Sequence, residues 1–166
     1  MIIGLAGWSG SGKTTLIKNL LPELNKINIS VSTLKHAHED FDIDKPGKDT
    51  YIHRESGAQE VLVSSKKRFA IISNYTNKES NLYQLIGKLS PVDLIMVEGW
   101  KKENIKKIEI YRKEINKPLL ALEDKNIVAI ATNDKSIKVN NVVLLDINNY
   151  EDIAMFIKNL IDEEKY

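Results

Sequence analysis

Gly7-Trp8-Ser9-Gly10-Ser11-Gly12-Lys13-Thr14 is the stretch that decides the expected fold. It matches the phosphate-binding loop pattern G-x-x-x-x-G-K-[ST] at every fixed position. The apolar run over residues 2–6 predicts a buried strand before the loop, and the apolar spacing from Leu16 to Leu24 predicts a helix after it. A loop that leaves a strand and opens a helix is the context in which this motif holds phosphate.

The residue types in the loop suit a nucleotide triphosphate. Glycines let the backbone approach a ligand closely, and the N–H groups of the loop and of the helix start face an anion. Lys13 is placed to reach the β- and γ-phosphates, and the Thr14 hydroxyl to hold Mg²⁺. The alternative is a glycine-rich turn that binds nothing. The predicted nucleotide-binding residues of the loop are Gly7, Ser9, Gly10, Ser11, Gly12, Lys13, Thr14 and Thr15.

Length, charge and cysteine content limit the classes of protein to which this chain can belong. A chain of 166 residues is predicted to form a single nucleotide-binding domain, 1–166. Its 24 basic and 23 acidic residues give a net charge of +1, which does not support nucleic-acid binding. The chain has no cysteine, so disulfides and thiolate metal sites are excluded. No apolar run fits a membrane span or a signal peptide, and we expect a cytoplasmic protein.

Strand and helix patterns alternate along the chain and predict an α/β fold: a mainly parallel mixed sheet flanked by helices. The loops after residues 6, 35, 98 and 131 should then gather at one edge of the sheet.

Residues 60–64 and 69–73 read as two strands with a basic turn between them, and hairpin-like pairs argue for some antiparallel strands. Residues 76–79 have the spacing of a capping box, and the apolar face from Ile153 to Ile161 predicts a final helix.

Two further strands differ in their expected exposure. Residues 107–112 alternate between apolar and polar side chains, as in a half-exposed strand, whereas residues 142–145 read as a buried strand. Pro22 and the segment Asn25 to Asn28 are expected to mark the end of the first helix.

Glu98 ends the apolar run 94–97, where phosphate-loop proteins carry an acid for Mg²⁺. It is therefore a candidate metal ligand beside Thr14, and a solvated acid before a glycine turn is the alternative. Asp42 and Asp44 in the acidic loop that follows residue 38 are further candidates for Mg²⁺. His36 and His38 resemble a transition-metal pair, but no third ligand is evident in the sequence.

Asp134 follows the predicted strand 127–131 and is a candidate reader of the guanine base of GTP. A carboxylate accepts from the ring N–H and the amino group of guanine, and Asn133 lies beside it. The sequence departs from the N-K-x-D pattern of GTP-binding proteins, and an Asn-Asp turn that reads no base stays an alternative.

Several motifs together resemble the molybdopterin-guanine dinucleotide biosynthesis protein B family. They are residues 7–16, 32–38, 40–49, 53–58, 97–101 and 107–110 with Arg112. The segment Asp40-Phe41-Asp42-Ile43-Asp44-Lys45-Pro46-Gly47-Lys48-Asp49 is the most specific of them. Where the family often has Phe after Glu-Gly, this chain has Trp100.

The resemblance implies a phosphate-loop protein that binds GTP, hydrolyses it weakly with Mg²⁺, and assists a guanylyltransferase in attaching GMP to molybdopterin or a molybdenum cofactor precursor. Lys35, His36, Lys48 and Arg54 are the residues expected to meet this second substrate or the partner. A small-metabolite kinase and a non-catalytic adaptor switched by nucleotide are the alternatives.

The resemblance also implies a homodimer. Because a bare sheet edge invites pairing, the strand predicted at residues 107–112 is the expected dimer edge, with its apolar face on Ile108 and Ile110. Lys106 and Lys107 would protect such an edge in a monomer, which is the alternative.

Overall fold

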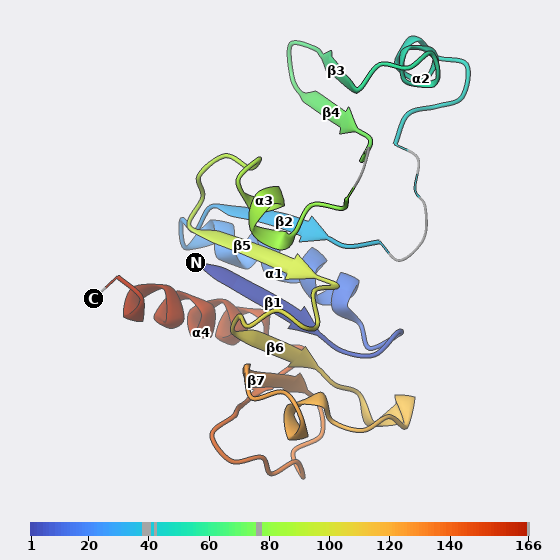
Figure 1. Ribbon diagram of the computed structural model, residues 1–166. Coiled ribbons are helices and arrows are strands. Elements are labelled where there is room, and N and C mark those ends of the chain that lie inside the picture. Colours follow the sequence, from blue (N-terminus) through green and yellow to red (C-terminus); the bar gives the residue numbers. More distant parts are fainter. Residues whose placement is uncertain (38–40, 42, 76–77, 166) are drawn as a thin grey trace. The chain divides into compact units, whose positions relative to one another are not determined.

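The computed structural model describes residues 1–37, 41, 43–75 and 78–165. The chain divides into two units, Met1–His36 with Ile86–Tyr166 and, between them, Ala37–Leu85. The single domain expected from the chain length stays a prediction. Figure 1 shows the elements in chain order. They are β1 (Ile2–Ala6), α1 (Lys13–Lys26), β2 (Val31–Lys35), α2 (Asp49–Glu55), β3 (Glu60–Ser64), β4 (Phe69–Ser73), α3 (Leu82–Ile86), β5 (Leu94–Glu98), β6 (Lys107–Ile110), β7 (Ile127–Thr132), β8 (Val143–Asp146) and α4 (Tyr150–Glu163), with short 3₁₀ turns at Lys113–Ile115 and Leu120–Leu122.

The first unit is built on a six-stranded sheet in the order β2-β5-β1-β6-β7-β8. Its five strand pairings are all parallel. The carboxyl ends of these strands therefore share one edge, which confirms the predicted gathering of the loops that follow them. The antiparallel pair that the sequence led us to place in a mixed sheet, β3 with β4, forms a separate two-stranded sheet in the second unit.

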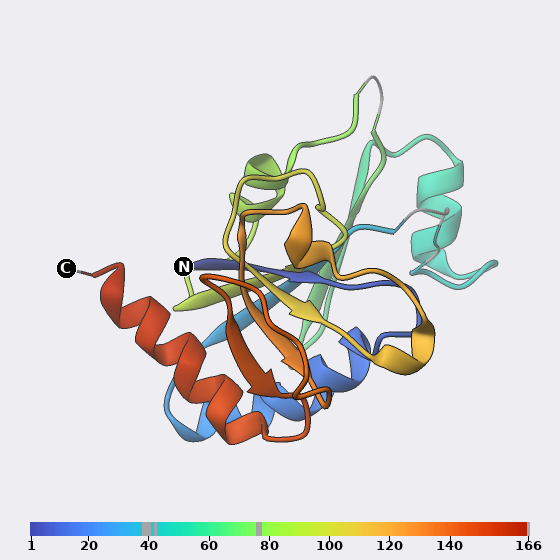
Figure 2. The same cartoon turned by 90° about the horizontal axis from the view of Figure 1, so that it is seen from below.

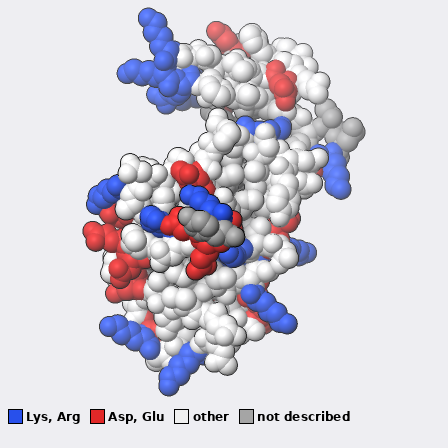
Figure 3. Space-filling model, turned by 90° about the vertical axis from the view of Figure 1, so that its left-hand side faces the viewer, with Lys and Arg blue, Asp and Glu red and all other residues white. Residues whose placement is uncertain are grey.

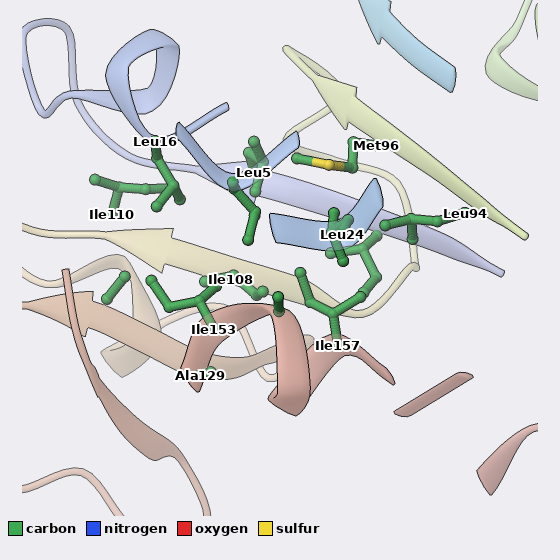
Figure 4. Packing of buried hydrophobic residues seen from close by; sticks show 14 of the residues in the cluster. Leu5, Leu16, Leu24, Leu94, Met96, Ile108, Ile110, Ala129, Ile153 and Ile157 are labelled. Atoms are coloured by element: carbon green, nitrogen blue, oxygen red, sulfur yellow. The ribbon is translucent and has the colours of Figure 1, made fainter. Parts of the chain in front are cut away.

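Helices α1 and α4 pack side by side against one face of the six-stranded sheet (Figures 1 and 2). Each buries one stripe of apolar side chains, because residues three and four apart share a helix face. Figure 4 shows Leu16 and Leu24 from α1 and Ile153 and Ile157 from α4 meeting strand residues such as Ile108. These side chains are at most 1% exposed. The sequence predicted both helices from this spacing.

Helix α1 ends at Lys26, within the segment 25–28 that was predicted to mark its end, but it runs through Pro22, which was wrongly expected to help end it. A proline inside a helix removes one backbone donor. Leu20 and Leu24 on either side of it are both fully buried, and this packing holds the last turn in place. The helix ends where Asn28 takes a left-handed conformation, with φ of 59°.

Strand β6 lies in the interior of the sheet, between β1 and β7. The prediction of a half-exposed edge strand at residues 107–112 was therefore wrong, because even its polar side chains, Lys107 and Glu109, are buried. The Lys107 ammonium donates to Asp124 Oδ2 at 2.7 Å and to the Lys101 carbonyl at 2.8 Å. Glu109 accepts the backbone N–H groups of residues 120 and 121 at 2.8 and 2.9 Å.

The edges of the described sheet are β2 and β8. Residues 142–145 were predicted to form a buried strand, but Val143 and Leu144 are 46% and 41% exposed. This apolar strand is exposed because it is an edge strand, with β7 as its only neighbour in the described sheet. The sequence pattern of an apolar edge strand is the same as that of a buried one.

The second unit carries the hairpin of β3 and β4 and the short helix α2. The bounds of both strands are those predicted from the sequence. Helix α3 begins at Leu82 and is capped reciprocally by Asn81 and Gln84, whose side chains accept from each other's backbone N–H. The sequence had placed that capping pattern at residues 76–79, of which 76 and 77 lie outside the described residues.

On the face that Figure 3 shows, the basic side chains of the first unit are interspersed with acidic ones. Among the described residues, no helix has both the length and the apolar character needed to cross a bilayer.

Candidate functional site

The phosphate-binding loop joins β1 to α1, as the sequence predicted. Gly7 has φ of 150°, and a Cβ there would lie 2.6 Å from Ser11 Oγ and 2.7 Å from the Ile110 carbonyl oxygen. Only glycine fits this position, since one of the two obstacles is backbone. The loop is thus held against the end of β6. Gly12 caps α1 in a left-handed conformation and accepts the N–H of Leu16 at 2.8 Å.

The Lys13 ammonium is held over the loop. It donates to the carbonyl oxygens of Gly7 at 2.9 Å and Trp8 at 3.1 Å. Partial burial lowers the pKa of Lys13, Glu98 opposes this shift, and the positive charges of Lys101 and Lys35 add to it. A half-buried ammonium with two cations nearby favours an anionic ligand, because such a ligand would relieve the repulsion among them.

The other loop residues differ in exposure. Ser9, Gly10, Thr14 and Thr15 are exposed to solvent. Ser11 is buried at 1% exposure, and its hydroxyl has no hydrogen-bond partner among the described residues. The loop therefore presents its polar atoms and the first turn of a 14-residue helix to solvent, as a phosphate site requires.

Arg112 is a site residue that sequence reasoning missed. Its Nε donates to the Ser11 carbonyl at 3.2 Å, and its guanidinium lies 3.4 Å from the position of a Cβ on Gly12. The residue follows β6, whose end lies beside that of β1 with Glu109 opposite Ala6. Only this sheet order, which no local motif carries, brings Arg112 to the loop.

Trp8 holds Lys101 and one further cation, Lys117, beside the loop. Its indole Nε1 donates to the Pro118 carbonyl at 2.8 Å. The ammonium groups of Lys101 and Lys117 lie 5.9 and 5.6 Å from the centre of its rings. Cation–π attraction at these distances holds both charges near the loop. The positive field around the phosphate-binding loop therefore comes from four segments of the chain.

Glu98 lies on the same sheet edge, next to the loop strand. Its register partners are Leu5 in β1 and Lys35 in β2. A cavity of about 170 Å³ is lined by Thr14, Lys35 and Glu98 together with apolar residues of β1, β2 and β5. The structure thus brings together the two residues of the first unit that were predicted to hold Mg²⁺. A hydroxyl and a carboxylate fit this hard cation, which usually keeps water and phosphate oxygens as its other ligands.

The turn after Glu98 fixes His36. The Glu98 carbonyl accepts the His36 N–H at 2.8 Å, and the imidazole lies 5.2 Å from the ring of Trp100. Gly99 has φ of 105°, and a Cβ there would lie 2.7 Å from His36 Cβ. His36 is thereby positioned within the first unit, while His38, its predicted metal partner, lies outside the described residues. Among the described residues, no three His, Cys, Asp or Glu side chains form a metal cluster.

The remaining predicted residues of the acidic segment lie in the second unit. Asp44 accepts from Arg54 through both carboxylate oxygens, at 3.2 and 3.4 Å, and its side chain is 4% exposed. Arg54 also pairs with Glu55 at 3.2 Å and covers the ring of Tyr51. Lys48 is exposed. Asp42 lies outside the described residues, so its predicted role stays a prediction.

A second cavity, of about 240 Å³, lies at the carboxyl ends of β7 and β8 and is lined by residues 132–135, 144–146 and 148. Asp134, the predicted base reader, is one of its lining residues. Its Oδ1 accepts the N–H and the hydroxyl of Ser136 at 2.9 and 2.6 Å. These bonds, with a smaller contribution from Lys113 at 3.8 Å, hold the pKa of Asp134 below its usual value.

Residues 2–133 match the family described as Molybdopterin guanine dinucleotide synthesis protein B. The chain belongs to this family. It is 41% identical over 95% of its length to the molybdopterin-guanine dinucleotide biosynthesis adapter protein of Haemophilus influenzae, covering 88% of that protein. It is 38% identical over 94% of its length to the adapter protein of Escherichia coli K12, covering 90% of it.

Solved structures of family members confirm the α/β phosphate-loop fold. A crystal structure of molybdopterin-guanine biosynthesis protein B superposes with a TM-score of 0.74 at 26% identity, covering 96% of this chain and 99% of that one. The homologue from Bacillus stearothermophilus gives 0.72 at 19% identity, with 98% of both chains covered. At 19% identity, the Bacillus stearothermophilus structure shows only that the two folds are similar.

Proposed function

We propose that this chain is a GTP-binding protein with weak, Mg²⁺-dependent GTPase activity that assists the guanylylation of molybdopterin in the cytoplasm. The observation that carries the proposal is the phosphate-binding loop, with Lys13 held over it and Glu98 on the neighbouring strand. The relatives from Haemophilus influenzae and Escherichia coli are named adapter proteins of molybdopterin-guanine dinucleotide biosynthesis. These names support the pathway and an accessory role beside a guanylyltransferase.

In this proposal, the loop N–H groups, Lys13 and Arg112 bind the phosphates of GTP. Thr14 and Glu98 hold Mg²⁺, whose chemistry is to neutralise charge on the phosphate oxygens. The base lies in the cavity at the ends of β7 and β8, which contains the carboxylates of Asp134 and Asp146. An adaptor that uses GTP only as a conformational switch is the second candidate, favoured by the word adapter in the names of the relatives.

The candidates for contact with the molybdopterin phosphate or the guanylyltransferase are considered unit by unit. Lys35 and His36 belong to the first unit, and Lys48 and Arg54 to the second. Because Arg54 is engaged by Asp44 and Glu55, Lys48 is the better candidate for a phosphate contact in the second unit.

We also propose a homodimer, now placed on the hairpin of β3 and β4 because β6 is interior. Leu62 and Ile71 face each other across the hairpin and are 60% and 54% exposed, and Phe69 is 68% exposed. An exposed apolar face of this kind is typical of a protein interface. A second copy of the chain would cover it.

A reconstituted guanylylation assay tests the function. Purified chain, guanylyltransferase, molybdopterin and Mg²⁺-GTP are combined, and dinucleotide formation is measured with and without the chain. We expect a higher rate with the chain, and tighter binding of GTP than of ATP by calorimetry. No stimulation together with preferred ATP binding would contradict the proposal. Stimulation that survives with a GTP analogue blocked only at the β–γ bond, which can still donate GMP to molybdopterin and release the remaining diphosphate analogue, would favour the switch.

A further inference from the structure

The cavity at the ends of β7 and β8 lies at the right place for the base of a nucleotide held by the loop. Across the sheet, the loop strand β1 is followed by β6, β7 and β8. Since neighbouring strands lie about 4.8 Å apart, the cavity is about 10–14 Å from the loop along the sheet edge. An extended nucleoside triphosphate is long enough to span such a distance between its base and its β-phosphate. The loop and the cavity can therefore hold the two ends of one ligand.

Two carboxylates reach this cavity, and they differ in what already binds them. Asp134 Oδ1 accepts two hydrogen bonds from Ser136, and its Oδ2 faces the Lys113 ammonium. The side chain of Asp134 is only 16% exposed. These contacts make Asp134 the anchor of the turn that shapes the cavity wall.

Asp146 has fewer hydrogen-bond and ion-pair partners than Asp134. It ends β8, in register with Thr132 at the end of β7, and its side chain lines the cavity. Its Oδ1 accepts the N–H of Asn148 at 2.9 Å, which fixes the orientation of the carboxylate. In the part of the chain that the structure describes, Asp146 forms no ion pair, and its Oδ2 has no hydrogen-bond donor. Leu144 and Leu145 on the same strand supply an apolar wall for the face of a base.

We infer that Asp146, rather than Asp134, reads the Watson–Crick edge of guanine and selects GTP over ATP. The inference rests on the proposed GTP binding. Guanine presents two donors side by side, the N1–H and the 2-amino group, and a carboxylate is a pair of acceptors that matches them. Adenine presents an acceptor at N1, so the same carboxylate would face a lone pair and reject it.

Asp146→Asn tests this assignment through a change of base preference. The asparagine oxygen can still accept from the Asn148 N–H, so the local fold is kept. Its amide donor would face the 2-amino group of guanine, whereas xanthine carries a carbonyl oxygen there. Competition binding with GTP, xanthosine triphosphate and ATP should show a loss of GTP affinity of about tenfold or more, and a gain for xanthosine triphosphate of similar size.

Asp134→Asn is the matched control, because it makes the same change on the other side of the cavity. It should lower GTP affinity without a gain for xanthosine triphosphate. The inference is overturned if Asp134→Asn gives the switch, or if Asp146→Asn leaves the preference of the wild type unchanged. Either result leaves the proposed function intact when the wild type prefers GTP. A wild type that prefers ATP overturns the proposed function itself, and the inference with it.

Discussion

Replacing Lys107 by alanine tests the interior position of β6, where the structure departs most from the sequence-based expectation. Lys107 is 2% exposed, and its stem covers Gly4, where a Cβ would lie 2.8 Å from Lys107 Cγ. Its ammonium bonds to the Lys101 carbonyl and to Asp124. The substitution removes all three interactions at once.

The cost can be worked out from these contacts. Loss of about three buried methylenes costs about 2 kcal/mol at about 0.8 kcal/mol each. A hydrogen bond to a charged group contributes about 1.5–3 kcal/mol. Loss of the bond to Asp124 costs less than this full amount. The Asp124 side chain is 27% exposed, so water can hydrate its carboxylate in the variant. We expect Lys107→Ala to lower the free energy of unfolding by about 3–5 kcal/mol, in the range known for breaking a buried ion pair.

Lys106→Ala is the matched control. Lys106 is the preceding residue and pairs with Glu164 at 3.3 Å, with both side chains well exposed. Such a surface pair contributes about 0–1 kcal/mol. Urea titration followed by circular dichroism measures both variants against the wild type. Equal costs for the two lysines would refute the buried position of β6 and restore the edge strand that the alternating sequence predicts.

Three further predictions concern the site and the core. Glu98→Gln should lower Mg²⁺-dependent GTP hydrolysis by about tenfold or more, while metal-free nucleotide binding measured by calorimetry changes little; equal losses in both would contradict a metal role. Gly99→Ala should lower the thermal midpoint more than Gly57→Ala, because both have φ near 100° but only a Cβ at residue 99 meets His36; equal shifts would exclude that contact. Burial raises the pKa of the Glu109 carboxyl, and the two backbone N–H groups that donate to it lower the pKa by less. The stability that the protonated Glu109 contributes is therefore lost as pH rises from about 4.3, the ordinary pKa of Glu, through its higher pKa in the folded chain. Glu109→Gln should remove this pH dependence from the free energy of unfolding. A variant with the same pH profile as the wild type would contradict the raised pKa.

The elements that local pattern determines could be predicted from the sequence. The strand, loop and helix around Lys13 follow from apolar spacing and one motif, and the bounds of β3 and β4 follow from short apolar runs around a basic turn. Glu98 could be selected because it ends the apolar run 94–97, and the structure places the end of that strand beside the loop strand. In each case the determining signal lies within about ten residues.

Contacts between distant residues explain what the sequence did not predict. Lys107 and Glu109 alternate with isoleucines as in a half-exposed strand, but Asp124 and the backbone of residues 120 and 121 satisfy both charges inside the fold. Arg112 reaches Ser11, a residue more than one hundred positions earlier, because β6 lies beside β1. These partners are set by the order of the strands, which no periodicity encodes.

The central claim, that the loop binds the phosphates of GTP through Lys13, is tested most directly by Lys13→Ala in calorimetric titration with Mg²⁺-GTP. Lys18→Ala, an exposed lysine on the same helix, serves as the control and should bind as the wild type does. We predict that Lys13→Ala keeps the melting behaviour of the wild type and loses GTP affinity by about a hundredfold or more, since charge-assisted bonds to two phosphates are removed. A folded Lys13→Ala variant with unchanged GTP affinity would contradict the account.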